Sequence, residues 1–153
     1  MSNYIMDIRK YVGHQTIIQC AASIICINDH GEILLGKRTD NHKWGYSGGS
    51  VEIDEKVEDC AKRELFEEMG LIADEIEFFY INSGPETHYI YPNGDEVSNI
   101  EVVYLCRKYH GQPKKQDEEI EELRFFPIDK INLEEISPPI RPVMKMYLEQ
   151  YKN

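Results

Sequence analysis

An unusually acidic segment constrains this chain more than any other part of its sequence. The segment GGSVEIDEKVEDCAKRELFEEMGL, from Gly48 to Leu71, places eight carboxylates against three basic residues. Like charges four positions apart destabilise a helix by about 0.2–0.5 kcal/mol per pair. A folded chain that keeps so many of them therefore needs a compensating attraction, unless the segment forms a solvated surface helix.

Helical geometry gathers three of these carboxylates on one face. At 3.6 residues per turn, Glu64, Glu67 and Glu68 fall within an arc of about 100°. Leu65 and Met69 belong to an apolar stripe beside this arc, so we expect the helix to pack on a sheet with its acidic row at the edge of the buried face. Neighbouring, partly buried carboxylates favour a divalent cation such as Mg²⁺, which is commonly held together with substrate phosphates.

Turn signals divide the rest of the chain into short elements, and no repeat or low-complexity linker separates them. The pattern predicts a mixed sheet with one central helix and one closing helix, an α/β or α+β fold in a single domain over residues 1–153. Gly48 and Gly49 predict a tight loop before the helix, whose backbone can approach a metal or a phosphate. The expected strands are 16–27, 32–37, 76–82, 99–106 and 122–126, and the closing helix is 142–151.

Composition limits the partners. The formal net charge of −11 excludes general attraction to a nucleic-acid polymer or an anionic membrane, so an anionic substrate needs local cations. The longest apolar run, at 16–27, is too short to span a bilayer, and the N-terminal segment lacks the apolar core of a signal peptide. We therefore expect a soluble, cytoplasmic protein, either a monomer or a homodimer.

Cysteine and histidine spacing indicates neither a metal centre nor a catalytic pair. The four cysteines form no CxxC pair and have no histidine at metal spacing, so we interpret all four as structural thiols. The five histidines are scattered and are expected at the surface. These residues are Cys20, Cys26, Cys60 and Cys106, and His14, His30, His42, His88 and His110.

The acidic segment resembles the Nudix box, a motif of nine positions at fixed spacing. The motif is a glycine, five residues, a glutamate, seven residues, and then Arg-Glu-aliphatic-x-Glu-Glu-x-Gly-aliphatic. Here it is filled by Gly49, Glu55 and the run RELFEEMGL from Arg63 to Leu71, so that the box covers 49–71. The resemblance extends outward to LLGKR, WGYSGG, YPNGDEV and DEEIEELRFF, and it implies the α/β/α sandwich of that family.

What the resemblance implies about chemistry can be carried over by position. Members of the family hydrolyse a nucleoside diphosphate linked to another group, using Mg²⁺ or Mn²⁺ and a water that attacks phosphorus. The resemblance therefore implies a metal-dependent pyrophosphohydrolase that acts on acid anhydrides of a small nucleotide-type substrate. In that reading Glu64 is the base or a metal-bridging ligand, Glu67, Glu68 and the Gly48 carbonyl are metal ligands, and Arg63 with Glu55 is the orienting pair.

Several assignments stay open. A glutamate downstream of the box joins the metals or acts as base in many members, and Glu119 fits this position best, with Glu118 close enough to compete. Arg38 is either a phosphate clamp or a surface ion pair. Trp44 either stacks on a base or ribose or anchors the core.

The chain departs from the motif's usual surroundings at two places. Ser47 replaces a common proline, and Asp54 replaces a common glycine before the glutamate, so we expect a slightly different loop. The main alternative is a non-catalytic Nudix-like domain that senses a nucleotide or binds a protein, for which loss of a box residue would be the sign. Box residues bind the diphosphate, so they leave open oxidised or ordinary nucleoside triphosphates, ADP-ribose-type compounds and capped RNA ends.

Overall fold

The computed structural model describes residues 4–116 and 118–151 of the chain. Its strands are β1 (Ile17–Cys26), β2 (Ile33–Arg38), β3 (Trp44–Gly45), β4 (Ser47–Ser50), β5 (Ile72–Asn82), β6 (His88–Ile90), β7 (Glu96–His110) and β8 (Ile120–Phe126). Its α-helices are α1 (Tyr4–Val12), α2 (Val57–Met69) and α3 (Arg141–Tyr151). Four short 3-10 helices are η1 (Pro85–Thr87), η2 (Ile128–Lys130), η3 (Leu133–Glu135) and η4 (Pro138–Ile140).

A mixed, five-stranded sheet forms the centre of the fold. Its order is β4-β1-β7-β5, with β6 paired to β7. The two central strands, β1 and β7, run parallel from the pair Ile17 and Val97 to the pair Cys26 and Cys106, while the other pairs are antiparallel. The apolar second half of β1, from Ala22 to Cys26, follows from this central place, because both faces of the strand are covered there, whereas its first half is partly exposed.

The second sheet is antiparallel, with the order β3-β2-β8. The predicted mixed sheet is therefore confirmed, and the structure adds this separate three-stranded sheet, which the sequence pattern did not distinguish. Two apolar cores result. Helix α2 packs Leu65 and Met69 into one core together with Ala22 and Cys106 of the central sheet. The other core joins the central sheet to β2, β3 and α3.

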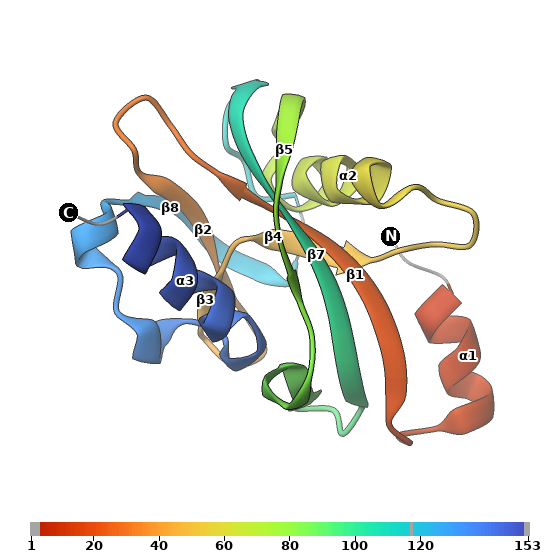
Figure 1. Ribbon diagram of the computed structural model, residues 1–153. Coiled ribbons are helices and arrows are strands. Elements are labelled where there is room, and N and C mark those ends of the chain that lie inside the picture. Colours follow the sequence, from red (N-terminus) through yellow and green to blue (C-terminus); the bar gives the residue numbers. More distant parts are fainter. Residues whose placement is uncertain (1–3, 117, 152–153) are drawn as a thin grey trace.

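Figure 1 shows these layers, with α2 on one side of the central sheet and α3 beside the smaller sheet. The amphipathic pattern of α2 has the expected result, because its apolar stripe is buried and Glu64 and Glu68 lie at the edge of the buried face. The closing helix is confirmed one residue earlier than expected, at Arg141. Within the described ranges, no helix is long and apolar enough to cross a membrane.

The structure corrects two local expectations and adds one element. The predicted tight loop at Gly48 and Gly49 is instead part of β4, in which Gly49 pairs with Ala22 of β1. Cys20 is exposed rather than buried, although all four cysteines are free thiols. Helix α1 was not expected from the pattern, and none of its residues is buried. Asp117, which opens the segment DEEIEELRFF, lies outside the described residues.

Candidate active site

Arg63 supplies an attraction that offsets the repulsion among the crowded carboxylates. From the middle of α2, its guanidinium donates to both oxygens of Glu55, with Nε 2.7 Å from Oε2 and Nη2 2.9 Å from Oε1. Nη1 donates to Glu64 at 2.9 Å and lies 3.3 Å from Glu67 Oε2. Nη2 also donates to the Ser50 carbonyl at 3.2 Å. One planar fork thus joins three carboxylates and the strand before the helix, a geometry that lysine cannot reproduce.

The glycines of β4 bring the backbone against the carboxylates of α2. The Gly48 amide donates to Glu68 Oε1 at 2.9 Å. A methyl group placed on Gly49 would overlap the carboxyl group of Glu64 and lie 2.6 Å from its Oε2. A methyl group on Gly48 would overlap the Ser23 hydroxyl. The two consecutive glycines therefore allow the backbone of β4 to lie against these side chains, since any larger residue would displace Ser23 or Glu64.

The electrostatic environment shifts the pKa values of Glu55 and Glu64, two of the glutamates bonded to Arg63, in opposite directions. Hydrogen bonds from Arg63 lower the pKa of Glu55 to about 2. Burial raises the pKa of Glu64 above its ordinary value, although the charge of Arg63 opposes this effect. A carboxyl group with a raised pKa is better suited to accept a proton near neutrality than one with a lowered pKa. Of the pair, Glu64 therefore has the properties of a base and Glu55 those of a positioning group.

The departure at Asp54 has a structural explanation. Asp54 adopts φ +64°, in the left-handed region where glycine is unstrained and aspartate is tolerated better than most residues. The turn then returns the chain to Glu55, whose Oε1 accepts from the Glu52 amide at 3.0 Å. The loop therefore keeps the conformation that a glycine favours, and Asp54 replaces the glycine at some cost in strain.

The two downstream candidates, Glu118 and Glu119, lie in the exposed turn before β8. The Glu119 carbonyl accepts from the Thr39 amide at 2.9 Å, which fixes this turn to the end of β2. Among residues 4–116 and 118–151, no three His, Cys, Asp or Glu side chains are arranged as a metal-binding group. The predicted convergence of Glu119 with the box glutamates therefore stays a prediction, while Glu64 and Glu67 converge on Arg63.

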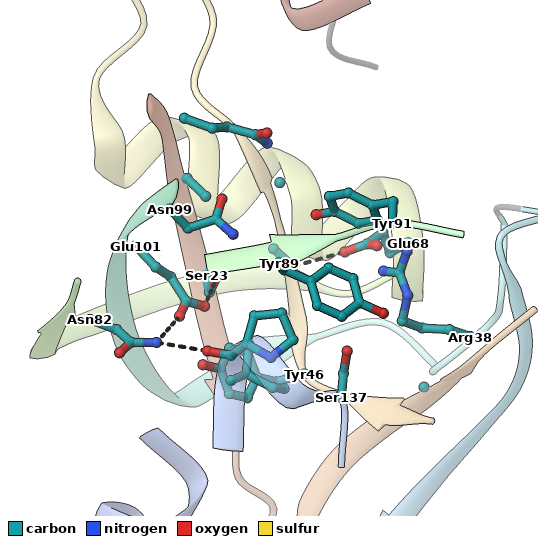
Figure 2. Close-up of a pocket in the computed structure, with 18 of the residues that line it drawn as sticks. Ser23, Arg38, Tyr46, Glu68, Asn82, Tyr89, Tyr91, Asn99, Glu101 and Ser137 are labelled. Carbon is teal, nitrogen blue, oxygen red and sulfur yellow. Dashed lines mark hydrogen bonds between the residues drawn. The ribbon is translucent and has the colours of Figure 1, made fainter. Parts of the chain in front are cut away.

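A cavity of about 120 Å³ opens beside these residues, between the two sheets. Gly48, Gly49 and Glu68 line it where β4 meets α2. Figure 2 shows Glu68, Tyr91 and Arg38 at one side of the pocket, with Asn82, Ser23 and Glu101 at the other. The box therefore lines one part of a larger site that can accept a group attached to a diphosphate.

Arg38 and Trp44 have different surroundings. Arg38 lines the cavity and also forms a two-pronged ion pair with Asp40, with distances of 2.9 and 2.7 Å. Trp44 is buried in the core, where its ring meets Phe126 edge-on at 4.8 Å between centroids. The structure therefore favours the core-anchor alternative for Trp44, because its ring packs against the smaller sheet and is not among the residues that line the cavity.

Sequence reasoning did not identify Glu101, Asn82 and Ser23, which form a buried polar group in the cavity. Glu101 is 6% exposed, and its two carboxyl oxygens accept from Ser23 Oγ at 2.6 Å and from Asn82 Nδ2 at 3.1 Å. Their signal in the sequence is a glutamate inside the apolar strand NIEVVYLC, two positions after Asn99, which lines the same cavity. Alternation along a strand puts residues two apart on one face.

Comparison with known proteins places these residues in a wider context. A family model described as NUDIX domain matches residues 18–147. An oxidized purine nucleoside triphosphate hydrolase of Danio rerio is 30% identical over 118 residues, which cover 71% of this chain and 67% of that protein. The structure of a MutT NUDIX hydrolase from Burkholderia pseudomallei superposes with a TM-score of 0.71 at 24% identity, covering 89% of this chain and 99% of that one, and so supports the fold.

Another match is shorter. An RNA pyrophosphohydrolase of Pseudomonas putida is 38% identical over 61 residues, which cover 40% of this chain. The matched segment spans only 38% of that relative's length. The similarity therefore concerns a part of that relative rather than its whole chain.

Proposed function

The chain belongs to the Nudix family, and on this premise we propose that it hydrolyses a phosphoanhydride bond in a nucleoside diphosphate linked to another group. The observation that carries the proposal is the contact between β4 and α2. There Arg63 holds Glu55 and Glu64, and the Gly48 amide holds Glu68, at the edge of a cavity. All nine positions of the box are filled, which favours hydrolysis over a non-catalytic sensing domain.

The residues present fit a divalent cation by the chemistry of their donor atoms, although no three acidic side chains in the described ranges are gathered around one point. Glu64, Glu67 and Glu68 of α2 and the Gly48 carbonyl offer hard oxygen donors, which Mg²⁺ and Mn²⁺ prefer. The close approach of Gly49 to Glu64 is consistent with this use, because it keeps a carboxyl group against bare backbone. When bound, such cations neutralise a diphosphate and supply Lewis acidity. We propose Mg²⁺, with Mn²⁺ as the alternative.

The chain's own residues then perform positioning and proton transfer. Arg63 keeps the Glu64 carboxyl group in place through a 2.9 Å hydrogen bond, and Glu55 fixes the guanidinium from the other side. Glu64 accepts the proton of the attacking water as the new P–O bond forms and the bridging P–O bond breaks. Its buried position and raised pKa suit that role. Glu119 and Glu118 remain the alternative bases.

Arg38 is the proposed contact for the non-transferred phosphate. Its bidentate bond to Asp40 holds the guanidinium at the cavity while leaving donors available to a ligand. The substrate is a small nucleotide-type molecule, and the net charge of −11 favours this over an RNA end. The names of the relatives suggest oxidised purine nucleoside triphosphates and RNA for the same test panel.

A substrate panel with defined products tests this function. Nucleoside triphosphates, ADP-ribose and a capped dinucleotide are incubated with Mg²⁺, Mn²⁺ or neither, in water labelled with ¹⁸O. We expect metal-dependent cleavage within a diphosphate and label on a product phosphate. Preference for a simple phosphate monoester over every nucleoside diphosphate derivative would refute the proposal.

Two variants assign the base. Glu64→Gln should lower turnover by about 10²–10⁴-fold, because a positioned base typically contributes that much. Asp59→Asn removes the same charge from an exposed position of the same helix and should leave turnover within about twofold. Near-normal turnover of Glu64→Gln would move the base role to Glu119 or Glu118, which the corresponding glutamine variants then separate.

A further inference from the structure

Glu101 is a buried carboxyl group that the proposed hydrolysis does not use. It lies on β7, beside Ala21 of β1 and Asn82 of β5 in the sheet register, and it lines the cavity. The side chains that donate hydrogen bonds of regular geometry to it, Ser23 Oγ and Asn82 Nδ2, are neutral. Among the described residues no lysine, arginine or histidine forms an ion pair with it.

A purely structural role explains this arrangement poorly. Asn82 Nδ2 also donates to the Pro139 carbonyl at 3.1 Å, so the group does connect β7 and β5 to η4. A neutral side chain could make that connection without the cost of burying a charge that lacks a cation. Both carboxyl oxygens act as acceptors, and the 2.6 Å bond from Ser23 is in the range of hydrogen bonds to an ionised carboxylate.

The carboxylate keeps capacity for a ligand. An ionised carboxyl group has about four acceptor sites, and Ser23 and Asn82 occupy two of them. The hydroxyl group of Tyr46 is buried beside Glu101 and interacts with its carboxyl group, but no described residue completes a hydrogen bond of regular geometry to that hydroxyl. Such a buried, incompletely satisfied polar group is typical of a surface completed by a bound molecule.

The rest of the cavity fits a flat ring. Tyr46 and Tyr89 line it together with Pro139 and Ile140, which provides aromatic and apolar surface beside the carboxylate. An apolar cavity of about 150 Å³ accepts a benzene ring. A purine is larger than benzene, so the space of about 120 Å³ admits a base because it opens to solvent. Figure 2 shows Glu101 across the pocket from Arg38 and Glu68, so that one ligand can reach both ends.

We propose that Glu101 selects substrates whose base presents two adjacent N–H donors, as the N1–H and N2 amino groups of guanine do. Adenine and cytosine place an acceptor nitrogen beside their amino group, which would face the carboxylate with a lone pair. Uracil offers one N–H between two carbonyl oxygens. The proposal rests on the function proposed above, and it names the substrate class as guanine nucleotides, including purines modified away from that edge.

Equilibrium binding of nucleoside monophosphates tests the selection without requiring hydrolysis, since these molecules have no phosphoanhydride bond. GMP, IMP and AMP present two adjacent donors, one donor, and a donor beside an acceptor. Calorimetry with the wild-type chain should give the order GMP, IMP, AMP, with about tenfold or more between the first and the last. A site built to hydrogen-bond a group discriminates strongly against analogues that lack it.

The variant Glu101→Gln keeps the shape of the side chain and replaces one acceptor oxygen by a donor. We expect it to weaken GMP binding by about 5- to 100-fold, the range for a good two-bond contact to a base edge, and not to weaken AMP binding, because an amide can donate to N1 of adenine and accept from its amino group. The matched control is Glu96→Gln, which removes the same charge from the same strand at a residue bonded to His88 rather than facing the cavity.

The outcomes decide between this inference and its alternatives. Equal affinity of the wild-type chain for GMP and AMP, or no measurable GMP binding at millimolar concentration, overturns the inference even if Glu101→Gln does not fold. Equal weakening of both ligands in Glu101→Gln would indicate a structural tie. Tighter binding of AMP than of GMP by the wild-type chain would overturn the inference and indicate a protonated Glu101, which burial favours. Base selection without hydrolysis of any nucleotide would refute the proposed function and leave this inference intact.

Discussion

Replacement of Gly49 by alanine should damage catalysis far more than stability. The new methyl group would lie 2.6 Å from Glu64 Oε2, whereas ordinary van der Waals contact begins at 3.4 Å. Cδ and Oε1 of Glu64 would lie even closer, so the carboxyl group must retreat by about 1 Å. A misplacement of about 1 Å in a catalytic group can cost about 10²-fold in rate, so we expect kcat to fall by about that factor.

The stability cost should be small because the obstructing atoms are the end of a flexible side chain. An altered rotamer of Glu64 costs about 0.5–1.5 kcal/mol, which corresponds to only a few degrees in the thermal midpoint for a chain of this size. Steady-state kinetics and thermal denaturation of the same preparation separate the two effects. A kcat within twofold of the wild type would refute the steric reasoning.

The Glu64→Gln background provides the control. If Gly49→Ala acts by displacing Glu64, it should cause little further loss of kcat once Glu64 is already disabled, because residues in one functional contact are not additive. A second 10²-fold loss in the double variant would show that Gly49 acts elsewhere, for example by altering the pairing of β4 with β1.

Three further predictions concern metal, acid and strain. Millimolar Mg²⁺ should raise the thermal midpoint more than sodium chloride of matched ionic strength does, because binding at one hundred times the dissociation constant adds about 2.7 kcal/mol to the free energy of unfolding. The double variant Glu67→Gln, Glu68→Gln should lose this extra shift, and coincident wild-type curves would contradict the prediction. The pKa of Glu55, lowered from 4.5 to about 2 by Arg63, implies stabilisation that is present above pH 4.5 and lost as the pH falls toward 2. Arg63→Gln should therefore destabilise the chain more at pH 6 than at pH 2 in urea denaturation, and equal effects would contradict the linkage. Asp54→Gly should change the unfolding free energy by less than about 1 kcal/mol, whereas Asp54→Val should cost about 1–2 kcal/mol because of its φ of +64°; equal stabilities would exclude strain at this residue.

The sequence predicted those features that depend on local spacing. The pattern of Leu65 and Met69 predicted which face of α2 is buried, and the resemblance to the Nudix box implied that Arg63 and Glu55 pair. The pairing of β4 with β1 could not be predicted in this way, because whether Gly48 and Gly49 form a loop or a strand depends on a partner about 26 residues earlier in the chain.

Glu101 illustrates a second limit of prediction from the sequence. A single glutamate in an apolar strand is compatible with an exposed edge, a bulge or a buried site, and only the tertiary contacts with Ser23 and Asn82 decide among these. Helix α1 was missed for a related reason. Its sequence is amphipathic, but it buries no residue and is held by contacts such as the bond from Arg9 to the Glu96 carbonyl, which spacing along the chain does not indicate.

The parallel pairing of β1 with β7 has a consequence for the synthesis of the chain. Ile17 pairs with Val97, so 80 residues separate the partners at the centre of the sheet. At about 5–20 residues per second, a ribosome needs about 4–16 s to produce the second strand after the first. During that interval the apolar strand β1 lacks its central partner, and closing so long a loop is entropically slow. Rapid translation between these strands should therefore increase the yield of folded protein, and pauses in that interval should increase aggregation.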